Sequence, residues 1–292
     1  MIARLRFFTL ICALSLPIVV RAQGLTAAPI DQALGRSGQK TGDVYRVGFP
    51  RTDLHVSVNG LAIKPGLALG SWAAFLGTDD NAMVMGDLVL LEEELNPVME
   101  KLLSSSFEIT AVHNHLMEET PKVLYMHYMG HGPVAQLATS LRAALSVSKT
   151  PLEKPSAAAE EPGPPAWVKM TEDAVGRTGT FRGGVLSYGV PRSDTITMAG
   201  MTIAPAAGVG EAINFQAADS GNVATTGDFV LTAEEVNPVL SELQGHHILV
   251  TALHSHMLTE QPRLFFMHFW CVGSPESVGA GIKAALSHVA VK

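Results

Sequence analysis

Cysteine is nearly absent from this chain, which has two among 292 residues. Cys12 lies in an apolar N-terminal run, so removal of that run leaves Cys271 alone and excludes an intramolecular disulfide. Charge is also sparse, at 16% of residues, and acidic residues outnumber basic ones by 27 to 20. A net charge of −7 argues against the basic face that nucleic-acid binding needs, so we expect no nucleic-acid partner.

The first residues are typical of a targeting segment. Arg4 and Arg6 form a positive start, residues 7–20 form an apolar run that is short for a membrane span, and a small-residue cleavage signal ends at Ala22. The pattern predicts a signal peptide over residues 1–22, without the lipobox of a lipoprotein. No later segment is long and apolar enough to span a membrane, so we expect an exported protein, either periplasmic or secreted.

The chain contains two diverged copies of one domain. Residues 113–127 read HNHLMEETPKVLYMH, and residues 254–268 read HSHMLTEQPRLFFMH. At the same spacing along the chain, GDLVLLEEELNPV (86–98) matches GDFVLTAEEVNPV (227–239), and GFPRTD (48–53) matches GVPRSD (189–194). So many collinear matches indicate an internal duplication.

The duplication divides the chain into four parts. After the signal peptide, we expect a first repeat domain over 23–148, a linker over 149–168 and a second repeat domain over 169–292. The linker is rich in proline, alanine and glutamate, which is typical of a semi-rigid connection outside any core. Two similar surfaces on one chain favour a pseudo-two-fold pairing of the halves.

Hydrophobic patterning predicts the same order of elements in each copy, ββββαββα. The first helix is expected to begin at Asn96 and Pro97, where asparagine would cap the helix and proline would take its first position. An antiparallel sheet with helices on one face, an α+β fold, follows from this order. In copy one the expected strands cover 43–49, 54–58, 72–76, 82–90, 107–116 and 123–130, and the closing helix covers 133–147.

Three histidines and a glutamate recur in both copies and suit a metal site. His113 and His115 are two residues apart, so on a strand their side chains point to the same face. A hairpin turn centred on Thr120 would place His127 opposite His113, whereas a turn half a residue away would put His127 on the other face. The candidate ligands are His113, His115, Glu119 and His127 in copy one, and His254, His256, Glu260 and His268 in copy two.

This set of ligands suits a divalent transition metal, with one site expected in each repeat. Imidazole and carboxylate groups suit zinc, manganese or iron. Met117, Met129 and His131 would suit copper, but copy two has Trp270 where copy one has Met129, so copper is the weaker candidate. The alternative is structural, with strand histidines that donate to carbonyls or stack on aromatic rings.

Four arginines and two aspartates also recur. Two of the arginines follow proline in equivalent turns, with an aspartate two residues later; we favour an ion pair that braces the turn over an anion clamp. The other two lie between glycines, and glycine-rich turns can cradle anions. Asp87 and Asp228 each follow a glycine, and they either join the histidines or cap a strand. The candidate anion-binding arginines are Arg51, Arg192, Arg36 and Arg177.

The blocks GDLVLLEEELNPV, TAVHNHLMEETPKVLYMHYMGHG and LRAAL resemble the LppY/LpqO family. The resemblance covers both copies and nearly the whole mature chain, and the His-x-His block is its most specific part. It implies an exported bacterial protein built on a domain of unknown function, and it transfers no activity. Weaker similarities link the histidine block to cupins and to LytM-type zinc peptidases, but each lacks part of the respective motif.

Three hypotheses about function remain open at this stage. The first is an exported metal-binding protein, with or without enzymatic activity. The second is a non-catalytic module that binds a small molecule or a cell-envelope component, in which the histidines are scaffold. The third and weakest is a cell-wall metallopeptidase.

Overall fold

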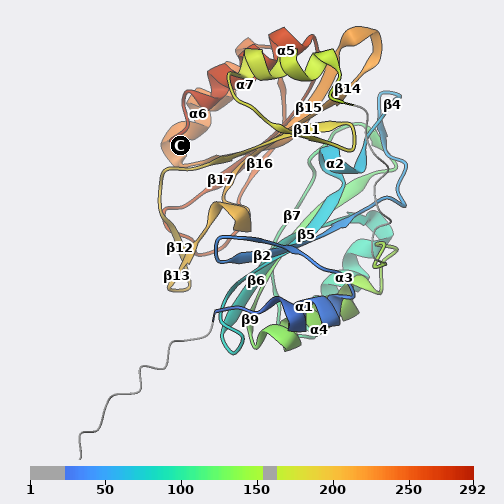
Figure 1. Ribbon diagram of the computed structural model, residues 1–292, viewed down its shortest axis with the longest axis vertical. Coiled ribbons are helices and arrows are strands. Elements are labelled where there is room, and N and C mark those ends of the chain that lie inside the picture. Colours follow the sequence, from blue (N-terminus) through green and yellow to red (C-terminus); the bar gives the residue numbers. More distant parts are fainter. Residues whose placement is uncertain (1–23, 154–162) are drawn as a thin grey trace, which may run out of the picture.

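Each repeat folds into one antiparallel six-stranded sheet with helices on one of its faces, so the predicted α+β class is confirmed. The computed structural model describes residues 24–153 and 163–292, and the predicted signal peptide lies outside them. Figure 1 shows four layers: the two sheets lie in the middle, α1, α3 and α4 lie on one outer side, and α5, α6 and α7 lie on the other. Among the described residues, no helix is long and apolar enough to cross a membrane.

The two sheets have the same strand order. In repeat one the order is β1 (Gln39–Thr41), β2 (Val44–Pro50), β5 (Gly70–Gly77), β6 (Ala82–Leu91), β9 (Val123–Gly132) and β7 (Glu108–His113). In repeat two it is β10 (Thr180–Arg182), β11 (Val185–Pro191), β14 (Gly210–Ala217), β15 (Val223–Leu231), β17 (Phe265–Gly273) and β16 (Leu249–His254). The same order in both sheets follows from the duplication.

The remaining elements cover the outer faces or connect the strands. The helices are α1 (Ala27–Leu34), α2 (Pro65–Ala68), α3 (Glu92–Leu103), α4 (Val134–Leu145), α5 (Ala166–Val175), α6 (Ala233–Gly245) and α7 (Pro275–Leu286). Two 3-10 turns are η1 (Pro205–Ala207) and η2 (Asp219–Gly221). Short strands outside the main sheets are β3 (Ser57–Val58), β4 (Leu61–Ala62), β8 (Glu119–Thr120), β12 (Ile196–Met198) and β13 (Met201–Ile203).

Alternation along the strands separates an outer core from a shared inner one. In β6, Val84 and Leu88 pack with residues of the outer helices, whereas Met85 and Val89 belong to clusters that contain residues of both repeats. Because successive side chains of a strand point to opposite faces, Asp87 shares the inner face with Met85 and Val89. The inner faces of the two sheets therefore pack against each other and form the contact between the repeats.

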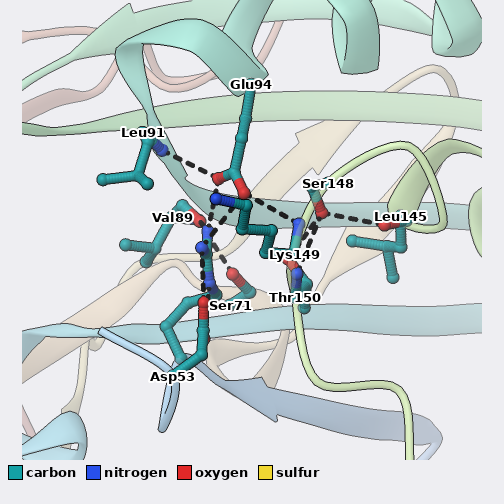
Figure 2. Close-up of polar contacts among 10 residues, drawn as sticks. Asp53, Ser71, Val89, Leu91, Glu94, Leu145, Ser148, Lys149 and Thr150 are labelled. Atoms are coloured by element: carbon teal, nitrogen blue, oxygen red, sulfur yellow. Dashed lines mark hydrogen bonds and ion pairs between the residues drawn. The ribbon is translucent and has the colours of Figure 1, made fainter.

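The start of α3 differs from the prediction. The helix begins at Glu92, and Pro97 lies inside it. The carboxylate of Glu94 accepts a hydrogen bond from the backbone N–H of Leu91, 2.9 Å away, as Figure 2 shows. Glu235 does the same for Thr232 in repeat two. This glutamate closes the first turn, so the helix starts before the Asn-Pro pair, as a T-x-x-E capping box in copy two would have indicated.

Two further differences concern short elements. An additional helix opens each repeat, α1 and α5, and each ends at a glycine in the left-handed conformation, Gly35 with φ 71° and Gly176 with φ 77°. The expected strand at 54–58 is reduced to β3, which pairs with β4 and β8 outside the main sheet. Short amphipathic helices and two-residue strands carry too little periodicity for detection.

Gly86 and Gly227 allow the inner strands to approach closely just before the two aspartates. A Cβ atom on Gly227 would lie 1.9 Å from the carbonyl oxygen of Ala212, and one on Gly86 would lie 2.2 Å from that of Trp72. Gly227→Ala should therefore lower the free energy of unfolding by more than about 2 kcal/mol, measured by chemical denaturation. Gly189→Ala is the matched strand control, because nothing lies within 4 Å of its added Cβ; equal losses in both variants would contradict the prediction.

Candidate metal centre

Strand register places two histidines of each repeat on the inner face of its sheet, and the third, His115 or His256, lies two residues past the end of β7 or β16. In repeat one, His127 on β9 lies between Asp87 on β6 and Ala111 on β7, and His113 pairs with Tyr125. A bulge between Ile109 and Ala111 sets this register. His113 is therefore diagonal to His127 rather than directly opposite it, with ring centroids 5.0 Å apart.

Repeat two has the same arrangement. His268 on β17 lies between Asp228 on β15 and Ala252 on β16, and His254 pairs with Phe266. The register again shifts at a bulge, between Val250 and Ala252. Both recurring aspartates thus face the histidines, and neither serves only as a strand cap.

The histidines of the two repeats meet in one cluster between the sheets. The stacked pairs are His113 with His254 at 3.8 Å between ring centroids, His115 with His268 at 3.6 Å, and His127 with His256 at 3.6 Å. His113, His115 and His127 of repeat one correspond to His254, His256 and His268 of repeat two. Swapping each histidine for its counterpart turns the second pair into the third and leaves the first pair unchanged. This is the pattern of an isologous contact about a pseudo-two-fold axis. The sequence predicted a separate site in each repeat, whereas the structure brings both sets together.

Ring orientation directs one nitrogen of several histidines into the cluster. The Nδ1 atoms of His113, His254 and His268 lie 3.2–3.3 Å from the backbone carbonyl oxygens of Asn114, Ser255 and Gly227, respectively. A carbonyl can only accept, so each Nδ1 carries the hydrogen and each Nε2 keeps its lone pair. This is the tautomer by which histidine usually binds a metal through Nε2.

Several of the Nε2 atoms have no hydrogen-bond partner although they are buried. This holds, within the described residues, for Nε2 of His113, His115, His127 and His256, and for Oδ1 of Asp87. Buried polar atoms without a partner are rare and costly in folded proteins. Lone-pair donors that converge without hydrogen-bond donors fit a cation better than they fit a structural network.

A close contact between two histidines of repeat two shows that their Nε2 atoms converge. Nε2 of His254 lies 2.7 Å from Nε2 of His268. Nδ1 of His254 lies near the carbonyl oxygen of Ser255, and Nδ1 of His268 lies 2.8 Å from Oδ1 of Asp228. At this distance the two nitrogens either share a hydrogen or both bind a cation, because two bare lone pairs would repel each other.

Burial keeps these imidazoles neutral. Loss of solvation, with repulsion from neighbouring rings, lowers the pKa of His115, His127 and His256 well below the usual value. The same causes lower the pKa of His254 to about 4. Neutral imidazole is the form that coordinates a metal, so no proton has to leave these rings before an ion binds.

Three groups of side chains could each hold an ion, because their ligand atoms lie within 4.8 Å of one another. Two of the groups combine residues from both repeats. The groups are His113 with His254, His256 and His268; Asp87 with His113 and His127; and His115 with Asp228 and His268. The chemistry of these donors, imidazole nitrogen with carboxylate oxygen, suits zinc, manganese or iron.

The two glutamates predicted as ligands lie outside these groups. Glu260 is buried, and its Oε1 accepts a hydrogen bond from the backbone of Leu264 at 3.0 Å, beside Arg263. Glu119 lies on β8 opposite Val58. Asp87 and Asp228 supply the carboxylates of the cluster instead.

The predicted arginines also lie away from the cluster. Arg51 is fully buried and donates to both carboxylate oxygens of Asp53 and of Glu94, which is the brace expected from the turn. Figure 2 shows Glu94 at the centre of these contacts, where it also accepts from the backbone of Lys149 at 2.7 Å. Arg192 repeats the pairing with Asp194 and Glu235, while Arg36 and Arg177 donate to backbone carbonyls.

A cavity of about 470 Å³ opens on the cluster between the two sheets. Asp87, His127, Asp228 and His256 line its inner side, and Arg46 and Trp72 line it as well. Sequence reasoning missed the last two because the duplication does not repeat them. The equivalent strand positions in repeat two hold Ser187 and Ala212.

Comparison with known proteins gives a family. The description "Domain of Unknown Function (DUF1259)" fits residues 28–147 and again residues 169–288. The chain belongs to this family. It carries two copies of the domain, as the internal duplication predicted.

Other comparisons add little. No curated protein matches the chain. The trimeric bacterial microcompartment shell protein PduB is 11% identical with a TM-score of 0.22, over 87% of this chain and 89% of PduB. EtuB from Clostridium kluyveri is 10% identical with a TM-score of 0.20, over 86% of this chain and 90% of EtuB. Similarity at this level carries no argument about function.

Proposed function

We propose that this DUF1259 protein is an exported metal-binding protein whose two repeats together hold a divalent transition metal. The observation that carries the proposal is the set of buried imidazole Nε2 atoms that have no hydrogen-bond partner within the described residues, those of His113, His115, His127 and His256. A purely structural histidine cluster would satisfy these nitrogens with donors. The predicted signal peptide and the resemblance to the LppY/LpqO family support export.

Zinc, manganese and iron are the metals that the donors favour. Imidazole nitrogens predominate in the cluster, and two carboxylates complete it. The methionines that would favour copper are not among the donor groups: Met117 is exposed, and Met129 packs in the apolar core between the sheets. When bound, the ion would supply Lewis acidity beside a cavity that admits small molecules.

Metal uptake by the purified protein tests the proposal. Chelator-treated protein titrated with cobalt(II) should develop the visible absorption of a nitrogen- and oxygen-ligated ion, and zinc should displace it. Elemental analysis of zinc-reconstituted protein should give at least about one ion per chain. A metal content far below this level, with no cobalt spectrum, would leave a non-catalytic module that binds a cell-envelope ligand.

A further inference from the structure

The cavity beside the histidine cluster contains one arginine with unused donors. The guanidinium carbon of Arg46 lies 3.8 Å from the centroid of the Trp72 ring, and Nη1 donates to the carbonyl oxygen of Ala206 at 3.0 Å. Within the described residues this is the guanidinium's one hydrogen bond, and it forms no close ion pair with Asp87 or Asp228. Stacking on Trp72 fixes the plane of the group, and its remaining N–H donors are available to a ligand.

The walls of the cavity are mostly apolar. Val190, Pro191, Pro205 and Ala206 contribute to them, and the volume is within the range of small-molecule sites. Gly208 allows the wall to approach Trp72, because a Cβ there would lie 2.7 Å from the indole ring. A ligand that fits this space has an apolar body and one polar end.

The net charge of the cavity determines whether the polar group of the ligand is an anion or a cation. Without a metal, two aspartates face one arginine, so the site does not favour an anion. A divalent ion held by neutral imidazoles would make the local charge positive, and Glu211 at the cavity wall is driven toward its neutral form because burial raises its pKa. An anion would then be favoured only when the metal is present.

We propose that the cavity binds a small carboxylate-bearing molecule, whose carboxylate pairs with the Arg46 guanidinium while its apolar body fills the space toward Val190 and Pro205. A planar carboxylate matches the two parallel N–H donors of a guanidinium edge. This inference rests on the proposed metal centre, and it names the class of ligand that the centre would act on or hold.

Benzoate and its cationic counterpart benzylamine are suitable probes, measured by calorimetry on zinc-loaded and metal-free full-length protein. Benzoate should bind the zinc-loaded protein and not the metal-free form, and benzylamine should not bind the zinc-loaded protein. Arg46→Gln should weaken benzoate binding at least about tenfold, since a charge-assisted hydrogen-bonded pair is lost. Ala212→Leu, which enlarges a side chain that lines the cavity and leaves the Arg46 guanidinium in place, should weaken benzoate binding similarly.

Arg177→Gln is the matched control, because this exposed arginine does not line the cavity and donates to the backbone carbonyl of Lys292. The zinc content of all three variants should equal that of the native protein. Zinc-loaded protein that does not bind millimolar benzoate, or that binds it equally well after both cavity substitutions, would overturn the carboxylate site and leave the metal centre standing. Native protein that takes up no zinc would overturn the metal centre itself.

Discussion

His113→Ala should weaken metal binding by the whole chain more than about 100-fold, which exceeds the usual loss for an outer-shell residue. His113 belongs to two of the donor groups, and one of them also contains three histidines of repeat two. Its ring lies 3.8 Å from that of His254, on the pseudo-two-fold axis. Removing this one ring therefore affects ligands from both repeats. Cobalt titration and elemental analysis measure the loss.

The result separates one shared centre from two independent ones. If each repeat held its own ion, His113→Ala would leave the site of repeat two with its native affinity. His131→Ala is the control, because this histidine lies on the same strand as His127 but is exposed. The metal-free variant should be folded, since the Nε2 atom of His113 has no hydrogen-bond partner to lose within the described residues.

Local pattern was sufficient to predict the face on which the histidines lie. Alternation along a strand predicted that His113 faces the same side as His127, and the duplication showed that the block forms a unit. The strand was predicted to run to residue 116, whereas β7 ends at His113 and His115 lies two residues beyond it. The position of Asp87 beside His127 follows from strand pairing, and the retained Gly-Asp pairs at 86–87 and 227–228 were its only signal. Glu119 was the nearer carboxylate in sequence, whereas the structure groups Asp87, and not Glu119, with the histidines of repeat one.

The meeting of the two repeats could not be predicted from the sequence. It depends on how the inner faces of two sheets pack, which is set by many weak apolar contacts between residues distant in the chain, such as Met85 and Phe266. The stacking of His115 on His268 exists only in that packing. The sequence did not single out Arg46 and Trp72, because repeat one carries them and repeat two does not.

The metal-free protein should lose stability steeply as the pH falls below about 6.5, the usual histidine pKa. A histidine whose pKa is lower in the folded protein binds protons more readily when the chain unfolds, so acid favours unfolding. Five cluster histidines have such lowered values: His113, His115, His127, His254 and His256. Their stabilising effect is complete above pH 6.5 and is lost as the unfolded chain becomes protonated.

Two buried carboxyl groups act in the opposite direction. Burial raises the pKa of Asp87 and of Glu211, so the folded protein takes up their protons first and gains stability on acidification. The five histidines outnumber the two carboxyl groups, so unfolding takes up protons overall, and each net proton corresponds to about 1.4 kcal/mol per pH unit. Typical folding free energies are about 5–15 kcal/mol, so we expect cooperative unfolding near about pH 5.

Denaturant unfolding of chelator-treated protein at a series of pH values measures this slope. A double variant, His127→Gln with His256→Gln, removes two of the titrating rings and should make the pH dependence clearly shallower. His131→Ala should leave it unchanged, because that ring is exposed. A metal-free protein equally stable at pH 7 and pH 5 would show that these five rings are not held buried and neutral, as metal binding requires. Saturating zinc should raise stability at pH 7 by mass action and should lose this effect as protons compete for the same nitrogens.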